Sequence, residues 1–244
     1  MHTRAESPTA LIVSAHAADF VWRAAGGIAT ITRNGGRAHV LCLSYGERGE
    51  SQGLWTNPDA DEASVKARRH EQCLQAAEIL GATIEFADAS DYPLRATEAV
   101  YNQVVDAMRA VQPDVIMTHA QRDPYNIDHS LTHEIVIRSR MIAQAAGHDR
   151  STSPIGAAQV LQFEPHQPEQ CGFQPNVLLD ISAVFDLKLK AMQVMEEAQG
   201  HLVNYYTELA GRRANQARRN GGPGSIHHAE AYERIFPVVV GDLW

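Results

Sequence analysis

The stretch Ala10-Leu-Ile-Val-Ser-Ala-His16-Ala-Ala-Asp19-Phe20 decides how the rest of the chain is read. Its mostly apolar first half, with no turn former, predicts a buried strand over residues 11–15, and helical periodicity continues over residues 20–33. His16 and Asp19 therefore lie on the turn between the carboxyl end of a strand and a helix. Open α/β sheets place their functional sites at that edge, because the loops converge there.

An imidazole and a carboxylate three residues apart on such a turn can bind one cation. On spacing alone, a helix-capping aspartate next to an incidental histidine is the simpler explanation of His16 and Asp19. The pair indicates a metal site only if other parts of the chain bring further ligands to the same edge.

The composition restricts the class of protein. With 244 residues the chain is long enough for one large α/β domain over residues 1–244, in which residues 210–244 form a tail that can contribute to the site or to an interface. No long apolar run predicts a membrane span, and the N-terminal residues lack the apolar core of a signal peptide. Three well-separated cysteines without a CxxC motif fit a reducing compartment, so we expect a cytoplasmic protein.

The formal net charge of -8 disfavours nucleic acid as a partner, because phosphate binding requires a basic surface. It does not exclude a small anionic substrate, which responds to a local group of arginines rather than to the net charge. The cysteine spacing argues against a thiolate metal site, so any metal must be held by nitrogen and oxygen.

Alternating strands and helices predict βαβ units and a mostly parallel sheet. The predicted strands cover residues 11–15, 38–43, 83–87, 114–119, 159–163 and 177–181. The predicted helices cover residues 20–33, 61–80, 98–111, 131–146 and 184–210. Gly26-Gly27 inside the first helix predicts a close approach to the sheet. The basic stretch 212–219, which precedes several glycines, predicts a mobile or partner-facing loop.

His16, Asp19 and His129 follow two strands that end at the same edge of this sheet. Two nitrogens and one oxygen leave a coordination position open, as in catalytic rather than structural zinc sites. Asp128 is a candidate to orient a ligand ring, or to act in catalysis, because it precedes His129. Taken alone, His129 would more often be a surface histidine at a helix start.

The chain resembles the PIG-L/LmbE-like superfamily, whose members are zinc-dependent enzymes with a Rossmann-like fold and are mostly N-deacetylases of amino sugars. The resemblance is carried by motifs that keep their order over nearly the whole chain: Ala15-His16-Ala-Ala-Asp19, Ser44-Tyr-Gly-Glu47-Arg-Gly49, Arg68-Arg69-His-Glu71, Asp128-His129, Asp180-Ile-Ser182 with Lys188, and Ala229-Glu230-Ala-Tyr232. It implies a three-layer α/β/α sandwich with a mostly parallel central sheet, and a zinc ion on His16, Asp19 and His129.

Two departures from the deacetylase pattern affect the expected chemistry. The deacetylases read AHPDDE at the first motif, where the first Asp is the general base, and this chain has Ala18 there. They read HPDH at the second motif, where the first His stabilises the oxyanion, and this chain has Asn126. Losing both groups would cost amide hydrolysis several orders of magnitude. A retained metal site without the hydrolytic groups indicates different chemistry on the same scaffold.

One branch of the superfamily, the 4-oxalomesaconate hydratases of gallate and protocatechuate breakdown, is similar to this chain in longer runs. These are Ser14-Ala-His-Ala-Ala-Asp-Phe-Val-Trp-Arg23, Cys42-Leu-Ser-Tyr-Gly-Glu-Arg-Gly-Glu-Ser51, Asp123-Pro-Tyr-Asn-Ile-Asp-His129 and Phe163-Glu-Pro-His-Gln-Pro-Glu-Gln-Cys171. The resemblance implies a hydro-lyase that acts on a small anionic keto-tricarboxylate and forms a homo-oligomer. A zinc N-deacetylase with an unusual base and a catalytically silent relative that binds a ligand remain the alternatives.

Residue roles follow for a hydration reaction. With Ala18 unable to act, Glu47 is the nearest candidate base or acid, and an ion pair with Arg48 is its structural alternative. His166 is a candidate proton donor with Glu169 as its orienting partner. The candidate substrate contacts are Arg48, Arg68, Arg122, Tyr125 and Asn126, where the arginines would clamp carboxylates. The ligand set leaves open whether zinc, manganese or iron is the working metal.

Overall fold

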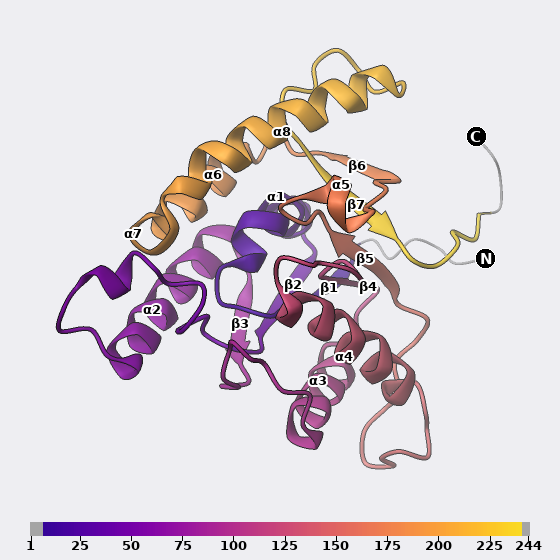
Figure 1. Cartoon of the computed structure of the whole chain (residues 1–244). Helices are drawn as coiled ribbons and strands as arrows, with labels where there is room; N and C mark the ends of the chain where they lie inside the picture. The colour runs from indigo at the N-terminus through magenta and orange to yellow at the C-terminus, as the bar shows by residue number, and fades with distance from the viewer. Residues whose placement is uncertain (1–6, 241–244) are drawn as a thin grey trace.

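The protein, described here as a computed structural model, is covered for residues 7–240; the first six residues and the last four of the expected tail lie outside the described residues. One seven-stranded sheet has the order β3-β2-β1-β4-β5-β7-β6 (Figure 1). The strands are β1 (Thr9–Ser14), β2 (Arg37–Cys42), β3 (Thr83–Phe86), β4 (Val115–Thr118), β5 (Gln159–Phe163), β6 (Val177–Asp180) and β7 (Ala229–Arg234). Only β7 runs antiparallel to its neighbours, β5 and β6. The mostly parallel sheet predicted from the sequence is confirmed.

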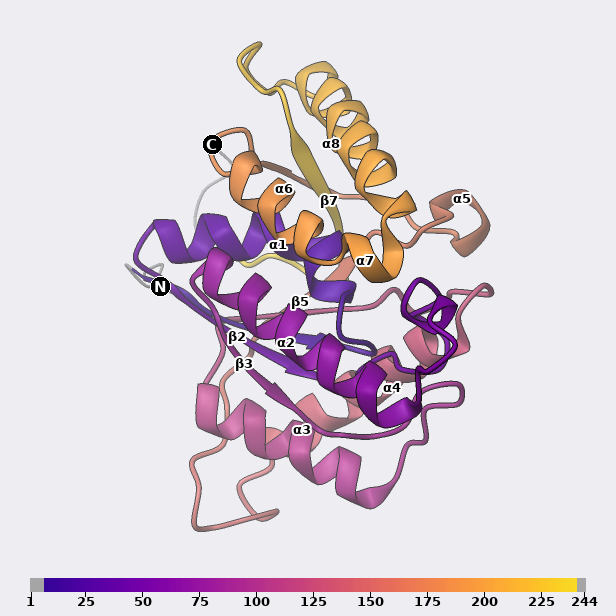
Figure 2. The same cartoon turned by 90° about the vertical axis from the view of Figure 1, so that its left-hand side faces the viewer.

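Helices cover both faces of the sheet, as Figure 2 shows, so the three-layer α/β/α architecture is confirmed. On one face lie α1 (Asp19–Arg33), α2 (Glu62–Leu80) and α8 (His201–Arg219), with α6 (Phe185–Val194) packed against α1 and α2, and on the other face lie α3 (Glu98–Val111) and α4 (Ile127–Ala143). The remaining short helices are a 3-10 turn, η1 (Leu54–Thr56), α5 (Pro168–Cys171) and α7 (Glu196–Gln199). No helix in residues 7–240 has the length and apolar character that crossing a membrane requires.

Strand β1 explains why its sequence is apolar without alternation. Ala10 and Ile12 face the core beneath α1 and α2, whereas Leu11 and Val13 face the core beneath α3 and α4. All four side chains are fully buried. A central parallel strand that is covered on both faces has no solvent side, so every position favours an apolar residue.

The close approach predicted at Gly26-Gly27 is confirmed. A Cβ on Gly26 would lie 2.7 Å from the Ile181 side chain, and one on Gly27 would lie 2.5 Å from the Tyr232 hydroxyl. The Glu230 carboxylate accepts the backbone N–H groups of both glycines at 2.8 Å. This contact fixes α1, and hence the turn that precedes it, against β7.

Two predictions for the C-terminal part were wrong. The helix predicted over 184–210 is divided into α6, α7 and α8, with Gly200 between the last two. The basic stretch 212–219 is the C-terminal half of α8 and not a loop. Its Ala214 and Ala217 pack against Ile226 and Ala229, so an apolar stripe inside the basic stretch makes it an ordinary amphipathic helix.

One further strand and the start of one helix differ from the sequence prediction. Strand β7 was not predicted, because its buried Glu230 interrupts the apolar pattern expected of an inner strand. Helix α4 begins at Ile127 rather than at residue 131, because the Asn126 side chain accepts the Asp128 N–H and caps the helix. Asp128 and His129 therefore lie in the first turn of a helix.

Candidate metal centre and active site

The candidate site lies where the loops after β1 and β4 meet, at the carboxyl ends of the strands. Strand β1 pairs with β2 on one side and with β4 on the other, so the chain order changes direction at this point of the sheet. Such a switch point separates the two loops and leaves a crevice between them. His16 and Asp19 come from the first loop and the start of α1, and His129 comes from the first turn of α4.

Both histidines predicted as metal ligands contact Asp19, the third predicted ligand. His16 Nδ1 lies 3.3 Å from Asp19 Oδ2, and His129 Nε2 lies 3.4 Å from Asp19 Oδ1. Both nitrogens are fully buried, and neither has a hydrogen-bond partner within the described residues. Two imidazole nitrogens that face one carboxylate are a donor set that can bind a divalent metal ion, so the residues fit the metal that the sequence predicts.

Each ligand ring is held through its other nitrogen by a second carboxylate. His129 Nδ1 lies 2.8 Å from Asp123 Oδ2, and His16 Nε2 lies 3.4 Å from Asp128 Oδ2. Asp128, which was predicted to orient a ligand ring, thus lies against His16 and not against its sequence neighbour His129. Carboxylates in this position fix the ring orientation and raise the basicity of the nitrogen that faces the metal.

The electrostatics of the cluster also favour a cation. Burial lowers the pKa of His16, but the carboxylates of Asp128 and Asp19 outweigh burial and raise that pKa to about 10. Burial raises the pKa of Asp19, yet His129 and His119 outweigh it and hold that pKa well below its usual range. The pocket therefore stabilises one added positive charge beside an ionised Asp19.

His119, the residue after β4, lies inside the cluster but was not predicted as part of it. Its ring stacks on His129 with centroids 4.1 Å apart, and its Nε2 lies 3.3 Å from Asp19 Oδ2. The same Nε2 accepts the Ala15 N–H at 2.9 Å, so its lone pair is already used. Burial and the nearby His129 lower the pKa of His119 to about 3, so the ring is neutral. Asp19, His119 and His129 form a group that could hold a metal ion, although the Ala15 N–H occupies Nε2 of His119 in this arrangement.

Glu50, from the loop after β2, is the second residue that the sequence prediction missed. One of its oxygens lies within 4.8 Å of nitrogens of both His16 and His129. Its carboxylate accepts hydrogen bonds from three neutral donors: the Tyr92 hydroxyl at 2.9 Å, Asn126 Nδ2 at 2.8 Å and Gln199 Nε2 at 2.9 Å. The only sequence signal for Glu50 was a further carboxylate in the loop that already contained Glu47.

Glu47, the base candidate from the sequence, has different surroundings. Its fully buried carboxylate lies 3.5 Å from Lys66 Nζ on α2, and neither oxygen has a hydrogen-bond partner within the described residues. Burial raises the pKa of Glu47. Glu47 is not in the group of metal-binding candidates around His16 and His129, whereas Glu50 is. The structure thus brings Glu50, and not Glu47, to the cluster.

His166 and its neighbours come from the loop after β5. His166 Nδ1 lies 3.0 Å from the Tyr206 hydroxyl, and the Tyr205 hydroxyl donates to the His166 carbonyl at 2.5 Å. Burial, followed by the charge of Arg23, lowers the pKa of His166 to about 4. Glu169 is exposed in α5, and its contacts do not include the His166 ring, so the tyrosines of α8 hold the ring that Glu169 was expected to orient.

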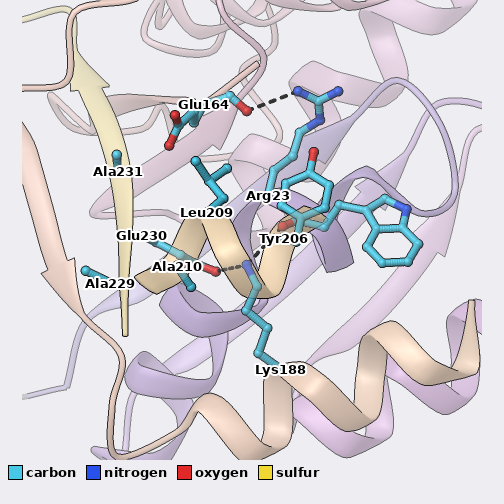
Figure 3. A pocket seen from close by; sticks show the side chains of 10 residues that line it. Arg23, Glu164, Lys188, Tyr206, Leu209, Ala210, Ala229, Glu230 and Ala231 are labelled. Carbon is cyan, nitrogen blue, oxygen red and sulfur yellow. Dashed lines mark hydrogen bonds and ion pairs between the residues drawn. The ribbon is translucent and has the colours of Figure 1, made fainter. Parts of the chain in front are cut away.

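Arg23 is the buried cation of the site. Its Nε lies 3.4 Å from Asp19 Oδ1, one helical turn away, and a terminal nitrogen donates to the Glu164 carbonyl at 3.1 Å. Figure 3 shows its guanidinium reaching Glu164, with Tyr206 beside it and with Lys188 paired to Glu230 further along the same pocket. The sequence prediction missed Arg23, although the i, i+4 spacing from Asp19 was visible.

The arginines predicted as substrate clamps lie outside this cluster. Arg48 is exposed and pairs with Glu62 at 3.3 Å. Arg68 is exposed and pairs with Glu197 at 2.7 Å and with Glu71 at 3.2 Å. Arg122 and Tyr125 are exposed in the loop after β4. Arg48 and Arg68 therefore already have carboxylate partners at the surface, away from this cluster.

The chain is similar to known enzymes of two kinds, a hydratase and deacetylases. The family model described as PIG-L, GlcNAc-PI de-N-acetylase, matches residues 11–139. A 4-oxalmesaconate hydratase of Pseudomonas putida is 48% identical over 238 residues, 96% of this chain and 92% of that protein. A diacetylchitobiose deacetylase of Thermococcus kodakarensis is 27% identical over 76% of this chain and 68% of that protein.

The solved structures that resemble this chain include the same two kinds of enzyme. GalB, the 4-carboxy-2-hydroxymuconate hydratase of Pseudomonas putida KT2440, matches with a TM-score of 0.94 and 47% identity over 97% of this chain and 100% of that one. The N,N'-diacetylchitobiose deacetylase of Pyrococcus horikoshii matches with a TM-score of 0.77 at 19% identity, over 93% of this chain and 83% of that one, which shows the shared fold. Because the family model covers more than half of the chain and the hydratase relative nearly all of it, this chain belongs to the PIG-L family.

Proposed function

We propose that this protein is a zinc-dependent hydro-lyase that adds water to the conjugated double bond of 4-oxalomesaconate and gives 4-carboxy-4-hydroxy-2-oxoadipate. The water oxygen bonds to the substituted alkene carbon, which carries the oxaloylmethyl group, and the π electrons move toward the carboxylate on the other alkene carbon. That other carbon then takes a proton. Atoms balance, because one water supplies both the hydroxyl and, through protein groups, the proton.

One observation carries this proposal: a buried cluster of histidines and an aspartate that could bind a metal ion stands beside an alanine where the deacetylases have their base. Ala18 is buried and has no ionisable group. Asn126, where the deacetylases have a histidine, donates to Glu50 instead. The relative that shares 48% of its sequence over nearly the whole chain is named a 4-oxalmesaconate hydratase. These findings support hydration over amide hydrolysis.

His16, Asp19 and His129 would hold the metal ion, for which we propose zinc. When bound, a divalent ion supplies a Lewis acid that lowers the pKa of water to about 7 or polarises a substrate oxygen. Zinc accepts two imidazoles and one carboxylate with a position left open, although manganese and iron accept the same set. Asp123 and Asp128 would keep the two rings oriented in either case.

Glu50 is the group that we assign to proton removal from the attacking water. Its carboxylate is held by neutral donors, so it remains an acceptor, and it lies next to both ligand histidines. The earlier candidate Glu47 is held beside Lys66 and is assigned no step. A positioned carboxylate base of this kind contributes roughly 10²- to 10⁴-fold to a rate.

His166 is the candidate proton donor to carbon. Its ring is neutral in the free protein, since its pKa is about 4. A trianionic substrate bound beside it would raise that pKa and draw a proton onto the ring. Arg23 supplies the buried positive charge that favours anionic groups at this end of the site, and Arg122 remains a candidate contact at the exposed rim, with Tyr125.

Two assays on the metal-loaded protein test the proposal. The loss of the ultraviolet absorbance of the conjugated double bond of 4-oxalomesaconate follows hydration, and release of acetate from N-acetylglucosaminyl conjugates follows deacetylation. We expect the first and not the second. Acetate release without hydration would establish the deacetylase alternative, and no turnover at full metal occupancy would establish a silent binding relative. The expected homo-oligomer stays a prediction, which sedimentation of the purified protein would test.

A further inference from the structure

Gln199 ends the short helix α7 and contacts Glu50 of the candidate site. Its side chain is buried, and its amide contacts three groups from three other elements. Gln199 Oε1 accepts Trp22 Nε1 at 3.1 Å and an Arg69 terminal nitrogen at 3.4 Å. Gln199 Nε2 donates to Glu50 Oε2 at 2.9 Å.

These partners determine the orientation of the amide. The indole of Trp22 and the guanidinium of Arg69 can only donate hydrogen bonds, so the atom that faces them must be the carbonyl oxygen of Gln199. The NH2 group is then left for Glu50, which as a carboxylate can only accept. A flipped amide would place its NH2 group against the donors of Trp22 and Arg69 and its oxygen against the Glu50 carboxylate, so all three contacts would be lost.

Arg69 strengthens this arrangement electrostatically. It is fully buried, and within residues 7–240 no carboxylate lies within 4.0 Å of its guanidinium. Its other neighbours are the Gln72 amide oxygen at 3.0 Å and the Met195 sulfur at 3.6 Å. The amide dipole of Gln199 thus lies between the positive charge of Arg69 and the negative charge of Glu50, with each end facing the charge that it stabilises.

The two oxygens of Glu50 are held from different parts of the chain. Oε1 accepts from Tyr92 and Asn126, which belong to the loops before α3 and α4. Oε2 accepts from Gln199, which arrives from the C-terminal third of the chain. The terminal torsion of a glutamate is soft, so donors on one oxygen alone do not fix the plane of the carboxylate.

We propose that Gln199 is a positioning residue: it fixes the plane of the Glu50 carboxylate toward the reacting water, and its own amide is oriented by Trp22 and Arg69. The inference rests on the proposed function, in which Glu50 removes the proton from water. Gln199 itself touches neither the metal ligands nor the substrate in this assignment. A misplacement of about 1 Å at a reacting group costs on the order of 100-fold in rate.

Gln199→Met tests this, because methionine keeps the length of the side chain and removes both hydrogen-bonding ends. We expect kcat to fall by about 10- to 100-fold, with KM and metal content unchanged. The matched control is Gln193→Met, the same change at an exposed position of α6, which should retain the wild-type kcat. In the Glu50→Gln background, Gln199→Met should lower kcat no further, since a residue that acts through Glu50 has nothing left to position.

If Gln199→Met does not fold, Trp22→Phe is the substitute test of the proposal, because it removes one of the two donors to Gln199 Oε1. We expect it to lower kcat severalfold at constant KM. The proposal is overturned if kcat per metal-loaded enzyme stays within about twofold of wild type, or if the effects of Gln199→Met and Glu50→Gln multiply independently. Should the wild-type protein not hydrate the substrate, the proposed function fails. Crystal structures of wild type and variant then test the positioning alone: an unmoved Glu50 carboxylate refutes it, and a rotated one supports it.

Discussion

On one side of the site, carboxylates hold two imidazole rings; on the other, neutral amides and a hydroxyl hold a carboxylate. His16 and His129 each have one nitrogen against an aspartate and the other facing Asp19. Glu50 receives hydrogen bonds from Tyr92, Asn126 and Gln199. The first arrangement increases the basicity of nitrogens that bind a cation. The second holds a carboxylate through neutral hydrogen-bond donors, which suits a proton acceptor.

The difference indicates a division of work between the two sides. The histidine side is built from the loops after β1 and β4 and is suited to hold a metal ion. The Glu50 side combines the loop after β2 with α7 and is suited to move protons. Changes on the two sides should therefore separate metal content from turnover, and the following predictions use that separation.

The largest effect is expected from His129→Ala on the histidine side. Removing a ligand should abolish stoichiometric metal binding and reduce hydration to background, a greater loss than the roughly 10- to 100-fold that follows removal of a carboxylate behind a ligand. Elemental analysis of the purified variant measures the metal, and circular dichroism checks that the fold is retained. A variant with full metal content would show that His129 is not a ligand.

On the Glu50 side, Glu50→Gln should lower kcat by roughly 10²- to 10⁴-fold while metal content stays at the wild-type level. Glu47→Gln is the matched comparison, because it is the same substitution in the same loop. We expect it to retain most of the activity, since Glu47 lies against Lys66. The reverse ranking in a steady-state assay would return the base to Glu47, as the sequence alone suggested.

The pKa of His166 predicts how stability depends on pH. This pKa is about 4 in the folded protein, against about 6.5 for an unperturbed histidine. Between these values the unfolded chain binds more protons, so stability falls as the pH decreases from about 6.5 to about 4 and His166 adds no further loss below that. The loss is at most about 3 kcal/mol. Urea unfolding of the metal-free protein should show it, and His166→Gln should show less of it; identical pH curves would contradict the prediction.

Asp123→Asn should have an intermediate effect, because it leaves the ligand in place and weakens what orients it. Asparagine can still accept a hydrogen bond from His129 Nδ1 but carries no charge, so we expect metal affinity to fall by about 10- to 100-fold. Competition with a chelator measures this affinity. Asp128→Asn gives the parallel test for His16, and unchanged affinity in both variants would show that the aspartates do not tune the ligands.

Much of the fold followed from local pattern. The mostly parallel sheet was predictable, because three patterns each indicate a single structural arrangement. These are the apolar run of β1, the glycine pair of α1 and the alternation of strands and helices. The exceptions lie in the C-terminal third. There, α8 has an apolar stripe of alanines among its basic residues. The buried carboxylate of Glu230 on β7 is stabilised by Lys188 and by two backbone N–H groups. Neither compensation is visible until the elements pack.

The site divides in the same way. That His16, Asp19 and His129 lie close together was predictable, because the ends of parallel strands meet at one edge of a sheet. Which of Glu47 and Glu50 lies next to them was not, because a loop has no periodicity that gives the direction of a side chain. Arg23 and Gln199 matter through contacts with Asp19 and Glu50, and a sequence does not show which of its many arginines and glutamines will be buried.

The smallest effect is expected from the exposed arginines. Arg48 and Arg68 already pair with glutamates at the surface, so Arg48→Ala and Arg68→Ala should change KM by no more than about twofold. Arg122 differs, because within residues 7–240 no carboxylate lies within 4.0 Å of it and it follows β4 next to Asp123. A substrate carboxylate at the rim would find its guanidinium unpaired, so Arg122→Ala should raise KM more than either of the other changes. Equal KM values for all three variants would leave Arg23 as the cation that recognises the substrate.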